Sequence, residues 1–277
     1  MTQEIRTVKY DDELKVEAYH FQGIMQKFPN HFHEYYVFGF IEKGRRLLSC
    51  KNKEYTIKPG DLLLFNPRDN HACEQIDGKT LDYRCINIQS EIMSKAVFEI
   101  TGKEQLPFFT PQVVSHSELV AALRELHQII MEGERDFKKE ELFFFFLEQL
   151  IEEYTEQAMP TDNARQSAEV RAICEFLGNH YMENITLDDL CKLTGLSKYY
   201  LLRSFAKQEG ISPYSYLETI RIDTAKKMLG QGFLPIDVAL QTGFVDQSHF
   251  SNFFKRFIGL TPKQYMNIFR NRNVEDH

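Results

Sequence analysis

The chain has 277 residues, of which 43% are hydrophobic and 26% are charged, and its formal net charge is −7. This length suits two domains and this composition is typical of a globular protein with buried cores. Five scattered cysteines without a Cys-x-x-Cys pair argue against a disulfide framework or a thiolate zinc site.

No segment has the pattern of a secretory signal or a membrane span. Residues 1–15 carry charges throughout, and the longest apolar runs, YYVFGFI and LFFFFL, are too short to cross a bilayer. We therefore expect a cytoplasmic protein with no membrane partner.

Residues 20–90 contain short runs typical of β-strands. Glycine and proline separate these runs, and no helical period passes through them. The runs are HFHEYYVFGFI, RRLLSCKN, EYTI, DLLLFNP, HACEQI and LDYRCINI. This pattern predicts an antiparallel barrel or sandwich.

The order of histidines, glycines and prolines in this region resembles the cupin barrel. The residues that carry the resemblance are His31, His33, Gly44, Pro59, Gly60, Asp61, Pro67 and His71. His31 and His33 are two apart, so on one strand they would share the face that lines a cupin interior, and His71 could join them. Tyr35 would lie on the same face, as a pocket neighbour or as part of the core.

In a cupin-like pocket these histidines could hydrogen-bond a small molecule. Three converging imidazoles could instead hold a metal. However, the glutamate that a metal-binding cupin would carry four or five residues after His33 is absent, since Val37 and Phe38 stand there. We expect no metal and no cofactor; a metal site and purely structural histidines are the alternatives.

Residues 116–157 change to helical spacing. Apolar residues recur at intervals of three and four in LVAALRELHQII and in EELFFFFLEQLIEEY. The phenylalanine run supplies more apolar surface than one buried stripe needs. It could pack on the barrel alone or also on a partner.

The two parts of the chain differ in charge. Residues 1–164 hold 19 Lys and Arg against 28 Asp and Glu, whereas residues 165–277 hold 14 against 12. This asymmetry is typical of a chain whose C-terminal part meets a polyanion. The polar stretch 155–166 separates the predicted domains, residues 1–158 and residues 166–277.

The C-terminal part contains one pattern twice. TLDDLCKLTG and LPIDVALQTG each end on a glycine, Gly195 and Gly243, four residues after a small side chain. A small residue and a glycine so placed suit two helices that cross through a tight turn. The sequence therefore predicts two helix-turn-helix units.

A second helix follows each turn. Ser197 and Asp246 are positioned as N-caps, and Leu201 with Phe205 and Phe250 with Phe254 form the buried stripes. Each unit then closes on Ser-Pro or Thr-Pro, a helix-start signal. The helix predicted over Pro213 to Leu229 would be about 25 Å long and would join the two units.

The polar faces of the second helices are rich in hydrogen-bond donors. Such side chains can contact base edges and phosphates in a major groove. Lys198, Lys207 and Lys255 are expected to contact DNA, with the last two acting mainly on phosphates.

Residues 168–270 resemble the DNA-binding domain of the AraC family of transcriptional regulators, most clearly in DVALQTGFVDQSHFSNFFKRFIGLTPKQY. The resemblance places the base-reading positions at Tyr199, Leu202, Arg203, Gln247, Ser248, Ser251 and Asn252, with Asn252 standing where an arginine is common. Many family members carry a cupin-like effector domain, and in relatives helices like those at 116–157 form a dimer interface.

We therefore predict an α+β protein: an N-terminal cupin-like antiparallel β-barrel with flanking helices, then an all-α domain of two helix-turn-helix units joined by a long helix. The predicted function is effector-responsive regulation of transcription without enzymatic activity, and activation is its expected direction. Predicted partners are double-stranded promoter DNA, a small-molecule effector, RNA polymerase and a second copy of the chain. The alternative is a metal-dependent cupin enzyme with a DNA-binding targeting domain, which metal analysis would distinguish.

Overall fold

The computed structural model describes residues 4–133, 137–155 and 167–270. The chain divides into two compact units. The first comprises Met1–Lys27 and His33–Ala158, and the second comprises Phe28–Phe32 and Met159–His277. None of the described helices is both long and apolar enough to cross a membrane.

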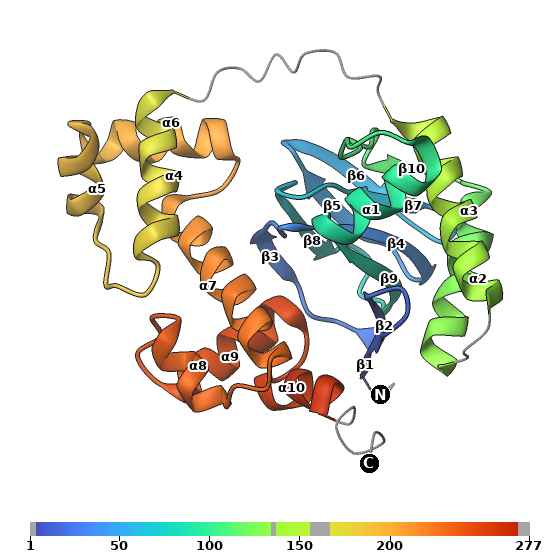
Figure 1. Ribbon diagram of the computed structural model, residues 1–277. Helices are drawn as coiled ribbons and strands as arrows, with labels where there is room; N and C mark the ends of the chain where they lie inside the picture. The colour runs from blue at the N-terminus through green and yellow to red at the C-terminus, as the bar shows by residue number, and fades with distance from the viewer. Residues whose placement is uncertain (1–3, 134–136, 156–166, 271–277) are drawn as a thin grey trace. The chain divides into compact units, whose positions relative to one another are not determined.

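The first unit contains a six-stranded antiparallel sheet (Figure 1). Its strands, in spatial order, are β1 (Ile5–Asp11), β2 (Val16–Ile24), β9 (Leu81–Gln89), β4 (Tyr35–Lys43), β7 (Leu62–Phe65) and β10 (Val113–Val114). The first two strands form a hairpin in which Ile5 pairs with Gln22 and Asp11 with Val16. The sequence pattern places the first strand at residue 20 or later, whereas this hairpin begins at Ile5.

A second sheet has four strands. They are β3 (Phe28–His31), β8 (His71–Gln75), β5 (Arg46–Cys50) and β6 (Lys53–Ile57), in that order. The predicted antiparallel β domain is confirmed. The run HFHEYYVFGFI is divided, because His31 ends β3 and Tyr35 begins β4 in the other sheet.

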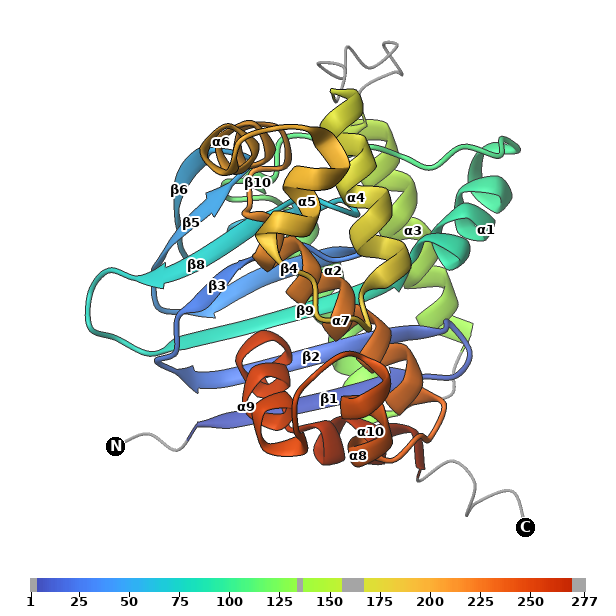
Figure 2. The ribbon, with the colours of Figure 1, turned by 90° about the vertical axis from the view of Figure 1, so that its left-hand side faces the viewer.

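Three helices cover one face of the six-stranded sheet (Figures 1 and 2). They are α1 (Ser90–Thr101), α2 (Leu119–Glu132) and α3 (Phe137–Tyr154). Alternate residues of the strands, such as Phe38 and Phe40, share one buried core with Phe143 and Phe146 of α3. Burial of these side chains attaches the predicted helices to the sheet.

The opposite face of the six-stranded sheet is also closely packed. Tyr35, Val37 and Phe65 are buried on it. A Cβ atom at Gly39 would lie 2.4 Å from the hydroxyl of Tyr83, so only glycine leaves room for this ring.

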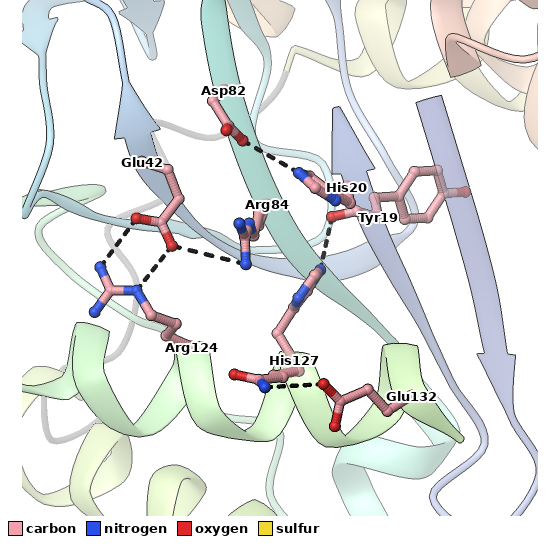
Figure 3. A network of polar contacts seen from close by, with 9 residues as sticks. Tyr19, His20, Glu42, Asp82, Arg84, Arg124, His127 and Glu132 are labelled. Atoms are coloured by element: carbon pink, nitrogen blue, oxygen red, sulfur yellow. Dashed lines mark hydrogen bonds and ion pairs between the residues drawn. The ribbon is translucent and has the colours of Figure 1, made fainter. Parts of the chain in front are cut away.

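Polar side chains replace apolar ones beneath part of α2 (Figure 3). Glu42 of β4 accepts hydrogen bonds from Arg124 of α2, at 2.8 Å and 3.3 Å, and Arg84 of β9 lies 3.8 Å from it. The Nε2 of the buried His127 lies 2.9 Å from the carbonyl oxygen of Tyr19. Because a carbonyl only accepts, the neutral ring carries its proton on Nε2.

The second unit is helical. Its helices are α4 (Ala168–His180), α5 (Leu187–Thr194), α6 (Lys198–Glu209), α7 (Pro213–Gly230), α8 (Pro235–Gln241), α9 (Gln247–Ile258) and α10 (Pro262–Arg270). Leu201, Phe205 and Tyr216 are buried in one core of this unit, and Phe32 belongs to the same core. The predicted connecting helix is confirmed as α7 and extends one residue further than expected.

Candidate DNA-binding and effector-binding sites

The first helix-turn-helix unit consists of α5, a tight turn and α6. A capping box between Thr186 and Asp189 starts α5, and Gly195 ends it with φ of 71°. Ser197 caps α6 by accepting a hydrogen bond from the amide of Tyr200. The predicted turn and N-cap are therefore confirmed.

The second unit consists of α8, a tight turn and α9. Gly243 has φ of 78°, and a Cβ there would lie 2.8 Å from the carbonyl oxygen of Tyr181. Asp246 caps α9 by accepting a hydrogen bond from the amide of His249 at 2.7 Å. Glycine is needed here both for the backbone angle and for the space.

The recognition face of α6 is exposed. Lys198, Leu202, Arg203 and Lys207 are exposed on one side, while Leu201 and Phe205 are buried on the other. The side chain of Tyr199 lies outside the described residues. Lys198 forms an exposed ion pair with Asp188, at 2.7 Å.

The corresponding face of α9 is polar and mostly uncharged. Gln247, Ser248, Asn252 and Lys255 are exposed, and Ser251 is half-buried. Arg256 lies over the ring of Phe253, 4.3 Å from its centroid. This face thus carries exposed amides and hydroxyls, with Lys255 near the end of the helix.

One exposed side chain of α6 was not among the predicted contacts. Tyr200 is 60% exposed and directly precedes the buried Leu201. The exposure of Tyr200 could have been predicted from the sequence, because a residue next to the core stripe of a helix points away from that stripe.

Three of the four predicted effector residues lie next to one another in the first unit, but not in the way that the sequence suggested. His33 lies in the connection between β3 and β4, so it does not share a strand with His31, and the expectation of a common strand face is wrong. The ring of His33 instead stacks on Tyr35 at 4.7 Å and lies 5.2 Å from the ring of His71. His33, Tyr35 and His71 are therefore neighbours within the first unit, whereas His31 belongs to the second unit.

His71 is held in a defined state. Its ring stacks on Phe65 at 4.2 Å, and its Nδ1 lies 2.9 Å from the carbonyl oxygen of Asp69. Burial lowers the pKa of His71 to about 4, and the backbone hydrogen bond offsets only part of this effect. The ring is therefore neutral at pH 7, with Nδ1 protonated and Nε2 available as an acceptor or a ligand atom.

Comparisons with known proteins show the family of this chain. A family model described as the AraC-like ligand binding domain matches residues 13–169. The chain belongs to the AraC family of transcriptional regulators. A helix-turn-helix model also matches residues 190–268, which span α6 and α9.

Relatives with similarity along most of their length are transcriptional regulators. The chain is 61% identical over 249 residues to the uncharacterized HTH-type transcriptional regulator YbfI of Bacillus subtilis, covering 90% of each chain. It is 23% identical to the HTH-type transcriptional activator RhaS of Escherichia coli O139:H28, covering 85% of this chain and 86% of RhaS. These names support the regulator and give no support to the cupin enzyme.

Solved structures show the same fold. An apo variant of ToxT from Vibrio cholerae superposes with a TM-score of 0.57 at 16% identity, covering 94% of this chain and 99% of ToxT. Wild-type ToxT with a bound unsaturated fatty acid superposes with a TM-score of 0.55 at 17% identity, covering 97% of this chain and 98% of ToxT.

Proposed function

We propose that this family member is an effector-responsive regulator that binds promoter DNA through α6 and α9. The observation that carries the proposal is that two capped recognition helices, each after a glycine turn, occur in one unit. The helix α7 has 18 residues, which corresponds to about 27 Å and is comparable with the ~34 Å of one DNA turn. Both helices can then enter successive major-groove segments.

The proposed roles of individual residues follow from exposure and chemistry. Arg203 and the amides of Gln247 and Asn252 would contact base edges, while Lys207 and Lys255 would contact phosphates. Lys198, Tyr199, Leu202, Ser248 and Ser251 complete the proposed interface. A protein that acts on promoter DNA in a bacterium is expected in the cytoplasm.

Activation through RNA polymerase is part of this proposal. The name of RhaS as an activator supports it, since the two chains match along most of their length. Enzymatic activity is not part of the proposal, because the relatives that match along the chain are named as regulators.

A homodimer through α2 and α3 is also proposed. A groove of ≈ 630 Å³ lies between these helices and residues 114–119. Phe145, which lines it, is 49% exposed, and its neighbour Phe144 is also exposed. Of the phenylalanine run, only Phe143 and Phe146 face the core, so the other two leave an apolar surface for a second copy.

The residues His31, His33, Tyr35 and His71 are proposed as the effector-binding cluster. The neutral ring of His71, whose Nε2 is available, can accept a hydrogen bond from a polar ligand or coordinate a metal. The fatty acid bound by wild-type ToxT supports the view that this fold accommodates small molecules. Effector binding changes DNA affinity only when the effector binds the two states of the protein differently.

Arg203→Ala is expected to weaken operator binding by about 1 to 3 kcal/mol and to relax base preference at one position of one half-site. Arg203→Lys should lose nearly as much, because lysine keeps the charge but cannot make the bidentate contact. Competition binding against a set of operator variants measures both effects. Lys103→Ala, which removes a cation from an exposed loop of the first unit, is the matched control. Equal weakening on every variant, with rescue by lysine, would show a phosphate contact instead.

The double variant His33→Gln and His71→Gln is expected to bind operator DNA normally and to lose its response to the effector. Glutamine keeps polarity and approximate size but removes the imidazole geometry. The measurement is operator affinity with and without a small molecule that alters the affinity of the wild type. His116→Gln, at an exposed position of the same unit, is the control. A double variant that responds like the wild type would show that these histidines are structural.

A further inference from the structure

We propose that a second cavity in the first unit binds a small carboxylic acid that also carries an amine or hydroxyl group. The cavity has a volume of ≈ 330 Å³ and is lined by Tyr10, Lys15, Glu17, Asn87, Gln89 and Glu91. This volume lies within the range of small-molecule sites. The inference goes beyond the proposed function, because this acid would be a ligand of the first unit in addition to the effector proposed for the histidine cluster.

Asn87 is the first observation that points to a ligand. It is only 8% exposed, and its Oδ1 accepts a weak hydrogen bond from the thiol of Cys85 at 3.7 Å. Its Nδ2 makes no hydrogen bond within the described part of the chain. Because Asn87 lines the cavity, this amide donor is available to a ligand there. Gln89, two residues further along β9, lines the same cavity, and its side chain likewise makes no hydrogen bond to any described residue.

The N-terminus of α1 opens into the same cavity. Its N-cap residue, Gln89, makes no side-chain capping hydrogen bond. Glu91 and Ile92, whose amides a cap would ordinarily satisfy, both line the cavity. A helix N-terminus carries partial positive charge and favours an anion. The exposed Lys15 adds a full positive charge at the rim, and it is paired with no described acidic group.

Glu17 gives the cavity a second chemical character. This buried carboxylate accepts a hydrogen bond from the hydroxyl of Tyr19 at 2.9 Å, and Glu17 pairs across the strands with Asn87. A carboxylate so close to the donors disfavours a simple anion such as phosphate. A ligand that brings its own donor satisfies both halves, with its carboxylate on Asn87, Gln89 and the helix and its amine or hydroxyl on Glu17. Amino acids and hydroxy acids have both groups.

The cavity lies on the face of the six-stranded sheet against which the ring of His71 packs. Asn87 pairs with Val37, Val37 pairs with Phe65, and the ring of Phe65 stacks on His71. These residues form one row across β9, β4 and β7. A ligand bound at Asn87 therefore occupies the same end of the sheet as the proposed effector cluster.

The test is ligand binding by the full chain in the absence of DNA. Probes are L-amino acids and 2-hydroxy acids, the corresponding amines and alcohols without a carboxylate, and inorganic phosphate. Thermal shift followed by calorimetric titration should find at least one acid that binds, with its decarboxylated counterpart at least about tenfold weaker and phosphate without effect. Absence of binding by every acid, or equal binding of phosphate, would overturn the proposal.

Three cavity variants localise the site. Asn87→Asp and Gln89→Glu each place a carboxylate against that of the ligand and should weaken binding about tenfold or more. Gln105→Glu adds the same charge at an exposed position and should leave binding unchanged. Lys15→Gln, at an exposed position, should weaken binding severalfold. Because it is exposed, this variant still tests the site if Asn87→Asp or Gln89→Glu does not fold stably. Undiminished affinity in all three cavity variants would contradict the assignment. If the proposed regulatory function were wrong, the wild type would not bind operator DNA, and this is measured separately from ligand binding.

Discussion

Replacing Lys139 with methionine is expected to destabilise the first unit by about 3–5 kcal/mol. The ammonium of Lys139 is buried, 2.6 Å from Oδ2 of Asp11 and 2.5 Å from Oε2 of Glu13. Burial on its own would lower the pKa of Lys139, but the hydrogen bonds to these two carboxylates outweigh it and raise the pKa, so the group stays charged. Methionine would leave the carboxylate of Asp11 buried without a cation.

Urea unfolding followed by circular dichroism measures this loss. Lys138→Met is the matched control, because the neighbouring Lys138 forms an exposed ion pair with Glu125 and its loss should cost at most about 1 kcal/mol. Combining Lys139→Met with Asp11→Asn should recover much of the stability, since the asparagine oxygen can still accept from the amide of Leu14 as Asp11 does. Equal unfolding midpoints for Lys139→Met and Lys138→Met would contradict this account of the pair.

Stability is also expected to fall steeply as the pH is lowered from 7.5 to 5. Burial lowers the pKa of both His71 and His127 to about 4, whereas an unfolded histidine has a pKa near 6.5. Below pH 6.5 the unfolded chain therefore binds protons that the folded chain does not, so acid favours unfolding. At pH 5, each of these two histidines should lower the free energy of unfolding by roughly 2 kcal/mol.

Unfolding free energies at pH 7.5 and pH 5 test this expectation. His127→Gln removes one titrating group and keeps a donor for the carbonyl oxygen of Tyr19, so the pH dependence should shrink by about half. His116→Gln, which replaces an exposed histidine, should leave the dependence unchanged. A slope that is the same in both variants would mean that His127 does not titrate as its burial requires.

The helix-turn-helix units could be predicted in detail because their determinants are local. Gly195 and Gly243 adopt the positive φ that the turns need, and Ser197 and Asp246 cap the helices that follow. A cap, a turn and a buried stripe at spacing four all act within about one helical turn. The amino acids themselves therefore determine where these helices begin and which faces they expose.

The N-terminal unit depended on tertiary structure at several points. The break between His31 and Tyr35 has no glycine or proline to mark it, and it arises because the two strands join different sheets. The burial of Lys139 was equally hidden, since its partner Asp11 lies 128 residues away. Likewise, Asn87 lies among strand residues with nothing local to mark it, and its cavity also needs β1, β2 and the start of α1.

The sequence by itself thus determined the two recognition helices, their polar faces, the helix between them and the β character of the N-terminal part. Only the tertiary structure decided which histidines meet, which charges are buried and where the second cavity lies. The physical reason is the range of the interactions involved. Helix caps and periodic burial act between neighbours in sequence, whereas desolvation of a charge or a cavity depends on segments that folding alone brings together.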